Sequence, residues 1–180
     1  RRLITVWCTV HKEVIDPSQG SVVHLAMPVH ILVLNYNGRQ LLAECLPSIV
    51  QAAASSCHAC QVAVIDNDSG DDSLAWLARH HPQISVIHHA NRGLCSFNDV
   101  LAELPGPVAV LLNNDIKLAP GAIDPLVGPL LDSDPAADSA CFMTAPLCWL
   151  FDGQTYEGFK TAVRWRWGLV QATALFEGHQ

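Results

Sequence analysis

The sequence predicts an α/β fold with a Rossmann-like layering: a mostly parallel sheet flanked by helices on both faces. Between residues 29 and 112, short and nearly all-apolar runs alternate with segments whose apolar residues recur at helical spacing. Such alternation is typical of strand–helix–strand units with parallel strands. The runs also lack the polar–apolar alternation of a half-exposed strand, which indicates strands buried on both faces.

The individual elements follow in order along the chain. Apolar runs predict strands over residues 29–34, 61–65, 84–87 and 107–112, and helical spacing predicts helices over residues 41–50, 71–80 and 96–104. Residues 120–132 also have a helix-like pattern, but Pro125 and Pro129 conflict with a long helix because an interior proline costs about 3 kcal/mol. We therefore expect a short or broken helix there, followed by a further strand region over residues 139–150.

Residues 1–26 differ from the rest of the chain. They lack a clear period and contain a Pro-Ser-Gln-Gly break at residues 17–20. We expect them to form an extension outside the main fold, which would then cover residues 27–180. The alternative is a genuine first strand over residues 3–10.

The composition excludes several classes of protein. Half of the 180 residues are hydrophobic and 15% are charged, which excludes a disordered tail, a collagen-like chain and a coiled coil. The net charge of −7 argues against a nucleic-acid partner, because binding to phosphates needs clustered cations. No apolar run approaches the roughly 20 residues of a membrane helix. The seven cysteines are scattered, with no recognisable secretory leader ahead of them, so we expect a cytoplasmic protein.

Several ligand-binding motifs are absent or weak. The sequence contains neither a Walker loop nor a G-x-G-x-x-G after the first strand, which disfavours a dinucleotide-dependent oxidoreductase. Cys57-His58-Ala59-Cys60 is the one C-x-x-C pattern, and no second ligand pair occurs at a zinc-like spacing. The sequence therefore favours free thiols over a metal at this position. The pairs His80-His81 and His88-His89 indicate solvated turns, because two histidines share a helical face at i and i+4.

Polar residues cluster where three of the expected strands end. The first strand runs into Asn35-Tyr36-Asn37-Gly38, the second into Asp66-Asn67-Asp68-Ser69-Gly70, and the fourth into Asn113-Asn114-Asp115. Ligands of open α/β sheets bind outside the carboxyl ends of the strands, so these ends predict one polar ligand site. The alternative for residues 66–73 is a turn followed by a helix cap, because Asp, Asn, Ser and Gly favour turns.

The acidic motifs leave two further possibilities and exclude one. Residues 66–77 do not fit a calcium loop, since Asp71 and Leu77 stand where that loop needs glycine and glutamate. Asp66-x-Asp68 after a strand is also typical of phosphatases with an aspartyl nucleophile, and this stays as a second enzyme hypothesis. Asp115 offers a carboxylate to a hard divalent cation, which could offset the charge of a diphosphate leaving group. Its alternative role is to cap the next turn.

Together these motifs resemble the family-2 glycosyltransferases of the GT-A fold, near their rhamnosyltransferase-like branch. Four segments carry the resemblance, in the order and at the spacing of the family: residues 29–38, 64–73, 91–94 and 111–122. The second is similar to the family's Asp-Asn-x-Ser-x-Asp-x-Ser segment, the third to its Asn-x-Gly-Phe, and the fourth to its metal-binding strand tip. The resemblance runs from about residue 28 to residue 131, more faintly to residue 178, and implies a C-terminally incomplete GT-A domain.

The resemblance implies a role for each motif residue. Tyr36 would lie against the nucleotide base, and Asp66 would accept the base imide N–H, which suits uridine or thymidine donors. Asn91 and Gly93 would line the diphosphate–sugar region. Asp115 would hold Mn²⁺ or Mg²⁺ against the diphosphate. The other nucleotide-sugar-binding residues implied by the motifs are Asn35, Asn37, Asn67, Ser69, Asn113 and Asn114, with Asn113 standing where many relatives carry an aspartate.

The implied reaction is transfer, with inversion, of a hexose from a UDP- or dTDP-linked donor to a glycan or lipid-linked saccharide, in the cytoplasm or at the inner face of the membrane. Two departures from the family pattern stand out. Phe97 occupies a position that is often small in relatives and would crowd the donor. The catalytic base is expected beyond Gln180, and Asp152 and Glu157 are the nearest candidates within the chain. The alternative is a non-catalytic fragment that binds nucleotide sugar and metal.

Overall fold

A computed structural model of the chain describes residues 28–106, 108–133, 141, 143–146 and 148–155, and the backbone of residues 4–8, 160–166 and 169–175. The chain forms two compact units, Arg1–Ala145 and Pro146–Gln180.

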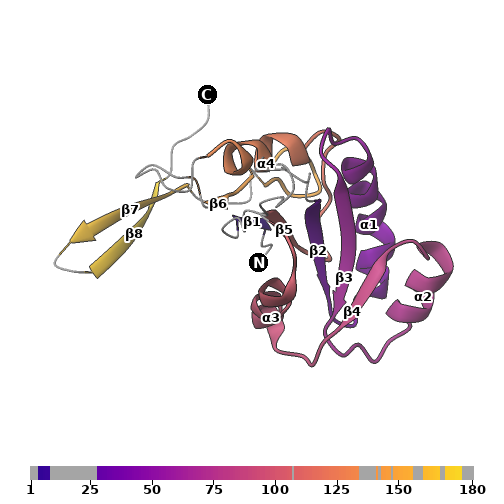
Figure 1. Ribbon diagram of the computed structural model, residues 1–180. Coiled ribbons are helices and arrows are strands. Elements are labelled where there is room, and N and C mark those ends of the chain that lie inside the picture. Colours follow the sequence, from indigo (N-terminus) through magenta and orange to yellow (C-terminus); the bar gives the residue numbers. More distant parts are fainter. Residues whose placement is uncertain are drawn as a thin grey trace, which may run out of the picture. The chain divides into compact units, whose positions relative to one another are not determined.

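A six-stranded sheet with the order β4-β3-β2-β5-β1-β6 forms the centre of the first unit (Figure 1). Its parallel strands are β2 (Val29–Asn35), β3 (Cys60–Asp66), β4 (Ser85–His88) and β5 (Val108–Asn113). These four strands confirm the predicted ones to within a residue at each end. The sheet continues beyond β5 with two antiparallel pairings, through β1 (Ile4–Cys8) and β6 (Met143–Thr144).

Helices cover both faces of this sheet, as predicted (Figure 1). One face packs against α1 (Arg39–Ala54), α2 (Ser73–His80) and α4 (Ile123–Leu131). The other packs against α3 (Ser96–Glu103), which follows the short 3₁₀ helix η1 (Gly93–Cys95). Consecutive strand residues serve opposite faces: Ile31 packs on the α1 side and Leu32 on the α3 side, and both are fully buried. This two-sided burial is the physical reason for the uninterrupted apolar runs.

Five residues of the expected N-terminal extension lie in the sheet. Ile4–Cys8 pairs antiparallel with β5, from Ile4 opposite Leu112 to Cys8 opposite Val108. These five residues therefore form a strand of the main sheet, as in the alternative of a first strand, and not an extension outside the fold. The sequence Ile-Thr-Val-Trp suits a strand, and it covers an edge of β5 that would otherwise leave backbone groups unpaired. The boundary near residue 27 stays a prediction, because residues 9–27 lie outside the described residues.

The helix after Pro120 is short, as predicted, but it is unbroken. Pro125 lies in the first turn of α4, where a backbone N–H would have no partner within the helix. Pro129 lies in the last turn, so its missing N–H removes one hydrogen bond near the end. In the region 139–150, the described residues contain the two-residue strand β6 and a bridge at Trp149.

The second unit contains an antiparallel hairpin of β7 (Lys160–Arg166) and β8 (Leu169–Leu175), with Lys160 opposite Leu175 and Arg166 opposite Leu169. Across the described part of the whole chain, no helix has both the length and the apolar character that a bilayer crossing requires.

Candidate functional site

Strand register brings the predicted polar ends together. Asn35 at the end of β2 is paired with Asp66 at the end of β3, and Leu34 is paired with Asn113 at the end of β5. Because the three strands are parallel, their carboxyl ends lie at one edge of the sheet. The convergence predicted from the sequence is therefore present.

A cavity of about 270 Å³ lies at this edge, and we call it the strand-end cavity. Its lining residues are Leu34, Tyr36, Asn67, Asn91, Gly93, Leu94, Asn113, Asn114 and Asp115. Seven of the predicted site residues are among them. Leu34 and Leu94 were not predicted, because an apolar residue beside a polar motif looks like core in a sequence. Tyr36 and Leu94 are 54% and 52% exposed, so the cavity presents an aromatic ring and an aliphatic side chain to a ligand.

A buried hydrogen-bond network supports the cavity from beneath. Asp66 is 2% exposed and Asn35 is fully buried. Asn35 Nδ2 donates to Asp66 Oδ1 (3.3 Å) and to Ser69 Oγ (3.2 Å). Asn35 Oδ1 accepts from Asn114 Nδ2 at 2.8 Å, so the network orients a residue of the cavity wall.

Three predicted contact residues, Asn35, Asp66 and Ser69, therefore belong to this network and do not line the cavity. Asp66 Oδ2 accepts from the backbone N–H of Ser69 at 3.1 Å, so both of its oxygens are engaged. A phosphatase nucleophile must reach a substrate, and the enclosure of Asp66 argues against that hypothesis.

Asn67 connects the network to the start of η1. Its backbone N–H donates to Asn35 O (2.8 Å) and its Nδ2 donates to Gly93 O (3.0 Å). Gly93 has a φ of +58°, which favours glycine, and its N–H donates to Asn91 Oδ1 at 3.0 Å. Asn67 is 1% exposed, and its Oδ1 has no hydrogen-bond donor among the described residues. This orphaned acceptor beside the cavity is a feature that a ligand donor group would satisfy.

The donor set at the end of β5 consists of oxygens. Asp115 is the one carboxylate among the described residues that line the cavity. Asn113 and Asn114 add amide oxygens at the same edge, and Asn114 Nδ2 donates to Asn35. One carboxylate with neutral oxygens suits Mg²⁺ or Mn²⁺, which bind few protein ligands and complete their shell with water and phosphate.

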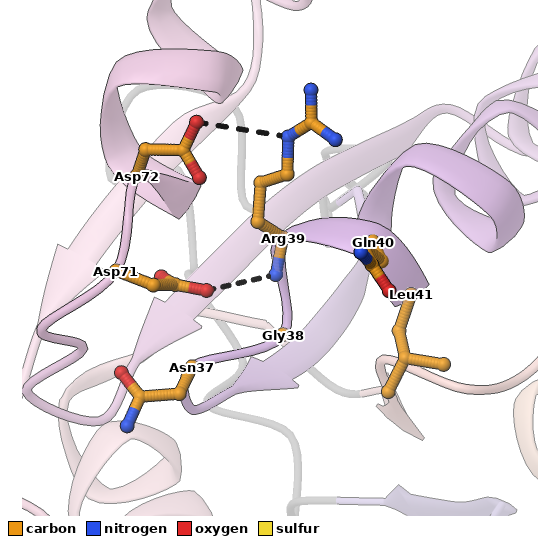
Figure 2. Close-up of a pocket in the computed structure, with 7 residues that line it drawn as sticks. All are labelled: Asn37, Gly38, Arg39, Gln40, Leu41, Asp71 and Asp72. Carbon is orange, nitrogen blue, oxygen red and sulfur yellow. Dashed lines mark hydrogen bonds and ion pairs between the residues drawn. The ribbon is translucent and has the colours of Figure 1, made fainter.

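A second cavity, of about 520 Å³, lies between the start of α1 and the loop before α2. Figure 2 shows its lining residues, Asn37, Gly38, Arg39, Gln40, Leu41, Asp71 and Asp72. Asn37, a predicted nucleotide-sugar contact, lines this cavity and not the strand-end cavity. It has a φ of +48°, and its Oδ1 accepts from Gly70 N at 2.7 Å. Asn37 therefore ties the loop after β2 to the loop after β3.

Asp71, which lines this second cavity, caps two helices. Its carboxylate accepts from Arg39 N at the start of α1 at 3.1 Å (Figure 2). It also accepts from Ser73 N at the start of α2 at 3.0 Å. Partial burial raises the pKa of Asp71, but the hydrogen bonds from Ser73 and Arg39 outweigh it and hold the pKa below its ordinary value. The carboxylate stays charged at neutral pH, where it interacts favourably with the positive ends of both helix dipoles.

Two other sequence predictions concern Phe97 and the catalytic base. Phe97 is 3% exposed and packs with Leu32 and Ile65 in the core beneath α3, so it does not crowd the cavity. Asp152 accepts from Thr155 Oγ1 (2.6 Å) and from two backbone N–H groups of its own turn. These bonds, led by that of the Thr155 side chain, hold the pKa of Asp152 below its ordinary value, which makes it a weak base. Glu157 lies outside the described residues.

The layering, the parallel strand order and the polar cavity at the carboxyl edge define a GT-A-like α/β domain. The family model described as glycosyl transferase family 2 matches residues 30–173, and the chain belongs to this family. The comparison with curated proteins gave no match.

Solved structures similar to this chain include two of S. aureus TarS 1-349 and one of a mannosyltransferase. TarS is 18% identical with a TM-score of 0.47, covering 59% of this chain and 33% of that one. Its complex with UDP-GlcNAc is 20% identical with a TM-score of 0.39, covering 49% of this chain and 27% of that one. The mannosyltransferase PcManGT from Pyrobaculum calidifontis, in complex with GDP-Man and Mn²⁺, is 24% identical with a TM-score of 0.38, covering 48% of this chain and 27% of that one. The chain thus spans about a third or less of the length of these structures.

Proposed function

We propose that the strand-end cavity binds a nucleotide-diphosphate sugar with a divalent cation. The chain would be the donor-binding part of an inverting glycosyltransferase that acts on a glycan or lipid-linked acceptor. One observation carries the proposal: the ring of Tyr36, after β2, and the carboxylate of Asp115, after β5, line the same cavity. The membership of the chain in glycosyl transferase family 2 supports it.

Tyr36 and Asn67 are the groups proposed to hold the nucleoside. Half of the Tyr36 side chain is exposed, and stacking of a base on such a ring is worth about 1–3 kcal/mol. A uracil or thymine base has an imide N–H that needs an acceptor. The resemblance assigns this acceptor to Asp66, but Asp66 is enclosed by Asn35 and Ser69. Asn67 is just as buried, but it lines the cavity and its Oδ1 has no donor among the described residues, whereas both Asp66 oxygens already accept hydrogen bonds. We therefore propose Asn67 Oδ1 as the acceptor, with Asp66 as a positioning residue.

Asp115 and Asn113 are the residues proposed to hold the cation, which would supply positive charge against the diphosphate leaving group. Asn91 and Gly93, which also line the cavity, would contact the diphosphate and sugar through an amide side chain and the backbone. The acceptor hydroxyl needs a base. Since Asp152 is occupied within its own turn, we propose that the base lies beyond Gln180 and that these 180 residues bind the donor without efficient transfer.

Calorimetric titration of the chain with UDP, dTDP and GDP, each with and without Mn²⁺, tests the proposal. We expect UDP or dTDP to bind best and only in the presence of the cation. Asp115→Asn should remove the Mn²⁺ dependence and most of the affinity. Tyr36→Ala should weaken binding by about tenfold or more, whereas Tyr36→Phe should retain it.

The matched control is Asp68→Asn, which makes the same charge change in a loop residue that does not line the cavity. Nucleotide binding that survives both Asp115→Asn and Tyr36→Ala would place the site elsewhere. Efficient sugar transfer by the purified chain would contradict the proposed position of the base.

A further inference from the structure

A cluster of metal-ligating side chains lies at the edge of the sheet opposite to the strand-end cavity. Cys57 and His58 belong to the loop between α1 and β3, just before Cys60, which pairs with the first residue of β2. Asp124 reaches this loop from the first turn of α4. The ligand atoms of Cys57, His58 and Asp124 all lie within 4.8 Å of one another. The proposed donor site uses none of them.

Ser56 and the backbone orient the carboxylate of this cluster. Asp124 Oδ1 accepts from Ser56 Oγ at 2.5 Å, and both Asp124 oxygens lie 3.2 Å from Cys57 N. Ser56 Oγ in turn accepts from His58 N at 3.1 Å. Ser56 therefore fixes both the acidic group and the backbone of the histidine, as the outer shell of a metal site does.

The chemistry of the three groups selects a different metal from that of Asp115. A thiolate, an imidazole and a carboxylate together are the ligands of Zn²⁺, whereas the oxygens at Asp115 suit Mg²⁺ or Mn²⁺. Ligands of a tetrahedral zinc lie roughly 3.5 Å apart, from bond lengths of about 2.0–2.3 Å. The three ligand atoms here lie within 4.8 Å of one another, so zinc binding would need them to move closer together. Cys57 is exposed, which gives its side chain room to rotate toward the other two.

We propose that Cys57, His58 and Asp124 bind Zn²⁺, with water as the fourth ligand on the exposed side. Binding would tie the α1–β3 loop to α4 across a sequence separation of 67 residues. The site would be structural, because it joins two segments of the first unit and lies away from the strand-end cavity. The sequence did not predict it, since its third ligand is remote from the Cys57–Cys60 pair.

Titration of the reduced full chain with Co²⁺, as a spectroscopic substitute for zinc, tests the proposal. We expect one Co²⁺ per chain, tetrahedral visible bands, and a near-ultraviolet thiolate charge-transfer band, all displaced by Zn²⁺. The Tm of the chain should rise with free zinc concentration, because the metal binds the folded state. Cys57→Ser should abolish the thiolate band, and His58→Ala and Asp124→Asn should each weaken zinc binding by more than about tenfold.

Three variants serve as matched controls. Cys60→Ser removes the neighbouring thiol at the start of β3, Cys95→Ser removes another exposed thiol, and His88→Ala removes an exposed imidazole. Each should leave the Co²⁺ spectrum and the affinity unchanged. Ser56→Ala, which keeps all three ligands, should weaken binding by about 10-fold.

Two results would overturn the proposal. The first is a Co²⁺ complex without a thiolate band, or no Co²⁺ binding, in a chain whose circular dichroism shows it to be folded. The second is Cys57→Ser and His58→Ala chains that bind zinc as tightly as the unaltered chain. Because Cys57 is exposed, its substitution should leave the metal-free fold intact, and His58→Ala provides an independent variant.

Discussion

Gly38 stands where the loop after β2 enters α1, and it is packed directly against the buried network. A Cβ at this position would lie 1.9 Å from Asn114 Nδ2 and 2.6 Å from Asn35 Oδ1. Gly38 has a φ of −116°, so an alanine fits the backbone and the whole effect comes from the contact. Gly38→Ala must therefore displace the Asn114 amide and break its 2.8 Å hydrogen bond to Asn35.

The magnitude follows from the burial of Asn35. Its side chain is fully buried, so Oδ1 would lose its donor without access to water. Leaving such an acceptor unpaired costs about 1–3 kcal/mol. For a chain of this size each kcal/mol lowers Tm by roughly 2–4 °C, so we expect Tm to fall by roughly 2–12 °C. The displaced Asn114 also lines the strand-end cavity, so UDP affinity should fall in the same variant.

Urea and thermal denaturation of Gly38→Ala, Asn114→Ala and the double variant provide the assay. If the clash acts through Asn114, the double variant should lose clearly less stability than the sum of the two single losses. Gly70→Ala is the matched control, because its Cβ would meet Asn37 Oδ1 at 3.9 Å, an ordinary contact. A Gly38→Ala chain as stable as Gly70→Ala, or losses that add to within about 0.5 kcal/mol, would show that the substitution does not act by displacing Asn114.

Two further predictions concern Asp71 and His30. Asp71→Asn should cost about 1 kcal/mol at neutral pH, because it weakens the caps of α1 and α2, whereas Asp68→Asn should not. The pKa of Asp71 in the folded chain lies below its ordinary 3.8, so the Asp71 carboxylate stabilises the fold fully above pH 3.8 and loses this effect as the pH falls through the lowered pKa. Urea titrations in strong acid that show Asp71→Asn to be as destabilising as at neutral pH would contradict this. His30 is 8% exposed and its Nε2 lies 2.7 Å from Pro105 O. His30→Phe should therefore lower the urea-unfolding free energy by about 1–3 kcal/mol, and an unchanged midpoint would show that this hydrogen bond contributes nothing.

Several features of the fold could be predicted from the sequence because they depend on local pattern. The apolar runs of β2 and β5 are long and uninterrupted, since Ile31, Leu32 and their neighbours are buried on both faces. Parallel strands also place their carboxyl ends at one edge. The convergence of Tyr36 and Asp115 on one cavity thus followed from the order of the elements.

Other features depended on contacts between distant residues. Ile4–Cys8 has residues that suit a strand, but its place in the sheet depends on pairing with β5, which lies far along the chain. The sequence does not show whether Asp66 lines the cavity or is enclosed. The hydrogen bonds from Asn35 and Ser69 enclose it.

The alternation of strands and helices, and the edge at which polar residues gather, could be predicted from the sequence. The folded structure was needed to show which of those residues face the cavity, and which distant residues, such as Cys57 and Asp124, come together. Periodicity follows from the side chains of one element and from the environments of its two faces. Enclosure of a particular atom depends on packing between elements, which residues remote in the chain supply.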